Sequence, residues 1–102
     1  MSTARLRATE RGDRLRLEGQ VDFTTARSLW REGTALLSGD GGVTIDLAGV
    51  TRADSAGVAL LIHWTRQQRD LGGRIEFANI PDQMLALARV SGVDTVLPLA
   101  DD

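Results

Sequence analysis

The side chains best suited to chemistry or recognition lie together in Asp54-Ser55-Ala56-Gly57. This tetrapeptide follows an apolar strand, Val43–Leu47, and opens a strongly apolar segment. A junction of strand and helix presents several unpaired backbone N–H groups at one surface point, and an aspartate there can cap them. We therefore expect Asp54 to be the N-cap of a helix. The small side chains of Ser55 and Ala56 leave room for another molecule to approach.

Ser55 does not have the neighbours that catalysis would require. The single histidine, His63, lies more than two helical turns later, about 12 Å along the axis at 1.5 Å per residue, so a Ser–His pair is not expected. No cluster of metal-ligating residues has helical spacing, and no Gly-Lys-Ser/Thr follows the glycines of Ser38–Gly42 to form a phosphate-binding loop. We expect no enzyme activity, metal or cofactor. A small hydrolase using Ser55 is the disfavoured alternative, and Ser55 is either a neutral first-turn residue or a hydroxyl that meets a partner.

The helix expected from about Ser55 to Asp70 is apolar on two faces. One face is assigned to the core, and the opposite face carries small and apolar residues together with the histidine. Such a helix is either deeply buried or contacts something besides its own core. In a chain of 102 residues, burial on both sides is hard to arrange, and we favour partner docking. The expected core face is Val58, Leu61, Ile62 and Thr65, and the expected partner-binding residues are Asp54, Ser55, Ala56, Gly57, Ala59, Leu60 and His63.

One glycine and four aromatic residues add to this picture. Glycine weakens a helix by about 1 kcal/mol relative to alanine, so Gly57 predicts a close approach, either by the sheet beneath or by a partner above. Trp30 falls on the apolar stripe of the preceding helix and is expected in the core, as are Phe23 and Phe77. Trp64 lies between the two faces of its helix and is expected to support the interface from the side.

The elements around this segment predict an α/β fold. Two alternating segments, Arg5–Thr9 and Arg14–Glu18, are separated by a turn signal at Arg11–Asp13 and predict a hairpin. Strand–helix–strand units then imply parallel neighbours in the same sheet. We expect a single domain over residues 1–102, with a mixed sheet flanked by about three helices. The expected order after the hairpin is a helix from near Thr24, a strand at Val43–Leu47, a helix at Ser55–Asp70, a strand at Arg74–Ala78, a helix at Gln83–Val90 and a short last strand at Thr95–Leu97.

Composition narrows the function classes. The net charge is −2 and all twelve basic residues are arginines spread from Arg5 to Arg89, so a nucleic-acid partner is not expected. The chain has no cysteine, which excludes disulfides. Its longest apolar run, Val58–Ile62, is far short of the roughly 20 residues that a membrane span needs. We expect a cytoplasmic protein that reaches a membrane only through a partner.

These motifs together resemble the STAS domain family. The resemblance rests on Asp54–Gly57 after the strand Val43–Leu47, in this order of elements, and it covers nearly the whole chain. It also includes Leu17–Asp22, which is similar to the L-x-G-x-(L/V)-D stretch that the family has before its first helix. The resemblance implies a mixed sheet flanked by helices and a non-enzymatic binding module.

Two branches of the family imply different partners. Anti-sigma factor antagonists bind a serine kinase anti-sigma factor and carry a phosphorylatable serine directly before the motif's glycine, where this chain has Ala56. The segment Asp54–His63 is more similar to the D-(T/S)-A-G-L-A-L-L-L-H helix of MlaB, the STAS subunit of Mla-type phospholipid ABC transporters. Ser28–Trp30 also resembles a Leu-Trp in the first helix of that branch.

The MlaB-like resemblance implies an accessory subunit that docks on the transporter's ATPase and lies at the inner membrane through it. The anti-sigma factor antagonist remains the alternative. Phosphorylation of Ser55 also stays open, because the N-terminus of a helix tolerates the added negative charge.

Overall fold

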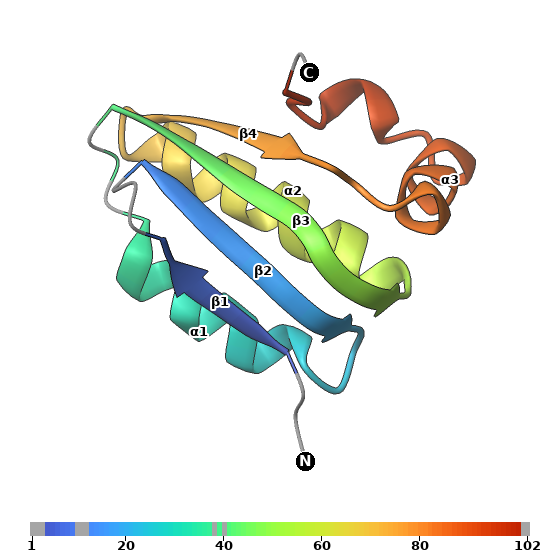
Figure 1. Ribbon diagram of the computed structural model, residues 1–102. Helices are drawn as coiled ribbons and strands as arrows, with labels where there is room; N and C mark the ends of the chain where they lie inside the picture. Colours follow the sequence, from blue (N-terminus) through green and yellow to red (C-terminus); the bar gives the residue numbers. More distant parts are fainter. Residues whose placement is uncertain (1–3, 10–12, 38, 40, 101–102) are drawn as a thin grey trace.

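The computed structural model describes residues 4–9, 13–37, 39 and 41–100, which fold into a sheet with helices packed against it (Figure 1). The strand order is β1-β2-β3-β4. β1 and β2 form an antiparallel hairpin, whereas β3 is parallel to both β2 and β4. The predicted mixed sheet is confirmed. The elements are β1 (Arg5–Ala8), β2 (Arg14–Val21), α1 (Ala26–Leu36), β3 (Gly42–Ala53), α2 (Ser55–Asp70), β4 (Arg74–Ala78), α3 (Asp82–Val90) and a 3₁₀ turn η1 (Asp94–Val96).

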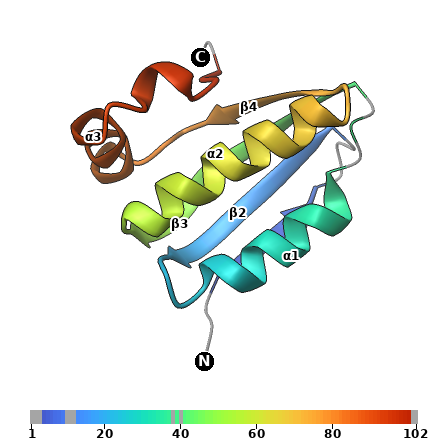
Figure 2. The ribbon, with the colours of Figure 1, turned by 180° about the vertical axis from the view of Figure 1, so that it is seen from behind.

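The two faces of the sheet differ because apolar and polar residues alternate along its strands. Leu15 and Leu17 of β2 are buried against the helices, while Arg16 between them is exposed on the other side. Seen from behind, α1 and α2 cover the same face of the sheet (Figure 2). The opposite face carries charged side chains, including an ion pair of 3.1 Å between Arg7 and Glu18.

Asp46 of β3 connects three segments on this charged face. Its carboxylate accepts hydrogen bonds from Arg14 (3.1 Å), from the Asn79 amide (3.0 Å) and from the Ala48 N–H (2.9 Å). Burial raises the pKa of Asp46, but these hydrogen bonds and the charge of Arg14 outweigh it, so the net pKa lies below the ordinary value.

Trp64 fills the space between the two main helices. Its side chain is completely buried, and it lies over Gly33 of α1, where an added Cβ would come within 2.1 Å of the indole nitrogen Nε1. The expectation that Trp64 supports an interface from the side is therefore wrong. The missing side chain at Gly33 lets the indole enter the core instead.

The end of the described chain also differs from the prediction. No strand forms at Thr95–Leu97, because η1 turns the chain tightly there. Pairing with β4 comes later: the Phe77 N–H donates to the Pro98 carbonyl at 2.8 Å, and Phe77 and Leu99 form an isolated parallel bridge. This segment covers the outer edge of β4. The turn residues expected at positions 11, 12, 38 and 40 lie outside the described residues.

Candidate protein-binding site

Asp54 organises the junction at the start of α2. One carboxylate oxygen, Oδ1, accepts the N–H of Ala56 at 2.8 Å, and the other, Oδ2, accepts the N–H of Phe23 at 3.3 Å. The first bond confirms the predicted N-cap. The second joins the helix to the loop between β2 and α1, so the two segments form one surface.

That loop is held by a second carboxylate. Asp22 Oδ1 accepts the hydroxyl of Thr24 at 2.5 Å and the N–H groups of Thr24 and Thr25 at 2.9 and 3.2 Å. The pKa of Asp22 is lowered, chiefly by the hydrogen bond from the Thr24 hydroxyl. Burial raises this pKa, but the hydrogen bonds from the backbone N–H groups lower it further. Asp22 is therefore ionised at neutral pH.

Phe23 projects from this loop with 77% of its surface exposed. The expectation that Phe23 belongs to the core is wrong. The hydrogen bonds of Asp22 and Asp54 fix the backbone on both sides, and the ring is left outside the core.

A shallow, open groove of about 340 Å³ runs between the first halves of α1 and α2. Trp30 forms one wall and is 43% exposed, so the core position expected for it is also wrong. Its Nε1–H donates to Nε2 of His63, and the two rings meet edge to face with centroids 5.2 Å apart. The groove is lined by Ala26, Arg27, Trp30, Ala56, Ala59, Leu60 and His63.

The predicted partner-binding residues separate into two groups. Ser55, Ala59 and His63 are exposed, and Asp54 and Ala56 are half-buried. These five line or adjoin one surface.

Gly57 and Leu60 are buried instead. A Cβ on Gly57 would come within 2.7 Å of the Val21 carbonyl oxygen. The close approach predicted at this glycine is therefore made by the sheet beneath it. Leu60 is only 5% exposed and packs in the core. Its expected place on an open face is wrong, although it forms the floor of the groove.

Sequence reasoning missed Phe23, Arg27 and Trp30 as members of this surface. Trp30 gave no signal, because an apolar stripe on a helix reads as core when its neighbour is unknown. Phe23 lies in a loop and Arg27 is charged, so neither belongs to an apolar periodic pattern. The position of Trp30 depends on Trp64, which already occupies the space between the helices.

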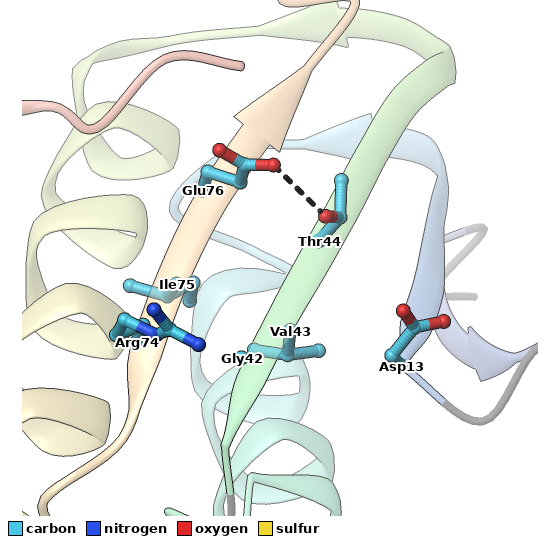
Figure 3. A pocket seen from close by; sticks show the side chains of 7 residues that line it. All are labelled: Asp13, Gly42, Val43, Thr44, Arg74, Ile75 and Glu76. Carbon is cyan, nitrogen blue, oxygen red and sulfur yellow. Dashed lines mark hydrogen bonds between the residues drawn. The ribbon is translucent and has the colours of Figure 1, made fainter.

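The structure also has a hollow next to this groove and another far from it. A groove of about 600 Å³ continues past His63 between the second halves of α1 and α2, with Arg66 and Leu71 among its lining residues. A polar pocket of about 420 Å³ lies at the far end of the sheet, where Thr44 donates to Glu76 at 3.3 Å (Figure 3). The first extends the candidate surface, and the second is separate from it.

Within residues 4–9, 13–37, 39 and 41–100, the Ser55 hydroxyl has no hydrogen-bond partner in the chain. Over the same residues, no group of three His, Asp or Glu side chains could hold a metal ion. No helix in this part of the chain is both long and apolar enough to cross a membrane.

Comparison with known families gives a match over almost the whole chain. A family model described as "Mlab, STAS domain" matches residues 4–99. Intermembrane phospholipid transport system binding protein MlaB of Escherichia coli (strain K12) is 31% identical over 88 residues, which cover 85% of this chain and 89% of that protein. The protein of the same name from Shigella flexneri matches equally well.

Solved structures share the fold at much lower identity. An anti-sigma factor antagonist from Mycobacterium paratuberculosis has a TM-score of 0.73 and 18% identity, covering 98% of this chain and 86% of that one. A protein described as a putative anti-sigma factor antagonist from Thermotoga maritima has a TM-score of 0.74 and 12% identity, covering 97% and 86%. At these identities the likeness concerns the fold alone.

Proposed function

The chain belongs to the STAS domain family, and on this premise we propose that it is a non-enzymatic binding subunit of a phospholipid-transporting ABC complex. In this proposal it docks on the complex's ATPase and stabilises or regulates it. The 31% identity to a phospholipid transport system binding protein supports the proposal that this chain acts in a phospholipid transport system. The proposed location is cytoplasmic, at the inner membrane through the ATPase.

The observation that carries the docking proposal is the groove between α1 and α2. Among its lining residues, Ala56 and Ala59 have side chains small enough for a partner's backbone to come close, and Trp30 and His63 supply a wall of ring edges. Apolar surface removed from water contributes roughly 25 cal/mol per Å². The Ser55 hydroxyl at the rim can add one hydrogen bond, worth about 1 kcal/mol.

Ala59 is the residue that tests this face, because it is exposed and its side chain is not needed by the core. We expect Ala59→Arg to weaken binding to the ATPase by at least about 100-fold, since an unpaired charge buried in an interface costs several kcal/mol. Ala86→Arg is the matched control, an exposed alanine on α3. The ATPase is first recovered by affinity purification of the tagged chain from its own cells, and its affinity for each variant is then measured by calorimetric titration.

Equal affinities for the Ala59 and Ala86 variants would exclude the groove as the docking site. Recovery of a serine kinase in place of an ABC ATPase would favour the anti-sigma factor antagonist, and phosphorylation of Ser55 by that kinase would then be the next assay.

A further inference from the structure

The loop between β2 and α1 holds an exposed aromatic ring on a firmly fixed backbone. Phe23 is 77% exposed, yet its own N–H is bound by Asp54 and the next two N–H groups are bound by Asp22. The hydroxyl of Thr25 also donates to the Gln20 carbonyl at 2.8 Å, and it accepts the N–H of Asp22 at 3.0 Å. The backbone of this loop is therefore ordered before any partner arrives.

We propose that Phe23 is an anchor residue that inserts into an apolar pocket of the ATPase. This inference rests on the proposed function and adds a contact outside the groove. A hollow of about 340 Å³ beside the ring includes Asp54 and Gln83 in its lining. Because Asp54 also caps α2, the ring and the groove belong to one continuous face.

The physical reason is the low entropy cost of such a contact. A ring on a fixed loop loses little freedom on binding, so most of its burial appears as affinity. Phe, Tyr and Trp also dominate the energetics of many interfaces because each buries a large apolar area. An exposed phenylalanine without a partner adds nothing to the stability of the isolated chain.

A protein pocket fits this ring better than a lipid surface. The neighbouring carboxylates of Asp22 and Asp54 accept the N–H groups next to the ring, and the pKa of Asp22 is lowered. One cation, Arg52, also lines the hollow, so its three charged side chains carry a net negative charge, which opposes approach to an anionic membrane.

The test compares Phe23→Ala with Val90→Ala, a change at an 88% exposed apolar residue at the other end of α3 from Gln83. The full chain is titrated with the co-purifying ATPase, and the fold of each variant is checked by circular dichroism. We expect Phe23→Ala to weaken binding by about 30-fold or more and Val90→Ala to change it by less than about twofold. Phe23→Leu, which keeps an apolar side chain, should recover part of the loss.

Two results would overturn the anchor alone. In the first, Phe23→Ala binds like the wild type although Ala59→Arg does not. In the second, Phe23→Ala leaves ATPase binding unchanged but loses sedimentation with phosphatidylethanolamine–phosphatidylglycerol vesicles, which would assign the ring to a membrane. Failure of the wild-type chain to bind any ABC ATPase would overturn the proposed function together with the anchor.

Discussion

At the scale of single residues, Asp46 shows how the charged face of the sheet contributes to stability. Its carboxylate joins Arg14 of β2 and Asn79 after β4 to its own strand. Asn79 adopts a φ of 57°, which an asparagine tolerates better than most residues. The hydrogen bond from its amide to Asp46 helps to hold this turn. The carboxyl group stabilises the fold more when it is ionised, because each of these contacts is stronger with the charged form.

We therefore expect Asp46→Asn to lower the free energy of unfolding by about 1 kcal/mol at pH 7. Because the folded pKa of Asp46 lies below its ordinary value of 3.8, the contribution is present above that pH. It is lost as the pH falls through the folded pKa. The difference between wild type and variant, measured by urea denaturation at pH 7 and pH 3, should shrink at the lower pH.

Asp13→Asn is the control, because the exposed Asp13 carboxylate lies outside the helices and has no hydrogen bond or ion pair within the described part of the chain. A stability difference for Asp46→Asn that is equal at the two pH values would contradict the assigned role.

The chemical types at the junction were predictable from sequence, but the burial of individual side chains was not. The capping role of Asp54 follows from residue type and position, and the structure confirms it. Trp30, Trp64 and Phe23 all take places different from those expected. Helical periodicity places a residue on a face, but whether that face is covered depends on the neighbouring element, which the sequence pattern does not contain.

At the scale of elements, the contact between α1 and α2 depends on one glycine. Gly33 would be read from sequence as a weak point of α1, because glycine costs about 1 kcal/mol relative to alanine in a helix. In the structure its bare backbone receives the buried indole of Trp64. The spacing of the two helices, and with it the width of the groove, follows from this contact.

Gly33→Ala should destabilise the protein by about 1–3 kcal/mol, the usual cost of overpacking a core, although helix propensity alone predicts a gain. The added Cβ would lie 2.1 Å from Trp64 Nε1. Urea denaturation followed by circular dichroism measures the change.

Gly42→Ala is a matched control, because the nearest heavy atom to its added Cβ is 3.9 Å away. Stabilisation by Gly33→Ala would show that α1 and α2 do not pack through this site.

Most elements could be predicted from sequence for a physical reason. Strands and helices with clear periodicity, such as β2 and α2, bury one side against a layer, and their pattern records that burial. The prediction of a last strand at Thr95–Leu97 failed because the pairing between Phe77 and Leu99 is a single bridge, and a single bridge leaves no periodic pattern in the sequence. The mixed sheet was expected from the hairpin and the strand–helix–strand units, and the antiparallel and parallel pairings of the structure agree with it.

At the scale of the whole molecule, the sheet separates two different surfaces. One face of the sheet carries arginines paired with carboxylates, as at Arg7 and Glu18, and is suited to water. The other supports α1 and α2, whose outer side gathers Trp30, Ala59 and the nearby Phe23. A partner that buries apolar surface gains most on the helical side, which is why the proposed docking face lies there.

The absence of cysteine allows a direct measurement of this central claim, because one introduced thiol is then unique in the chain. Ala59→Cys and Ala86→Cys would each be labelled with a maleimide, with and without the ATPase. The proposed docking predicts that the ATPase slows labelling at position 59 by about tenfold or more, because the centre of an interface excludes water. Labelling at position 86 should keep its rate. Unchanged labelling at position 59 in a complex shown to have formed would contradict the account, because the partner would then bind another face.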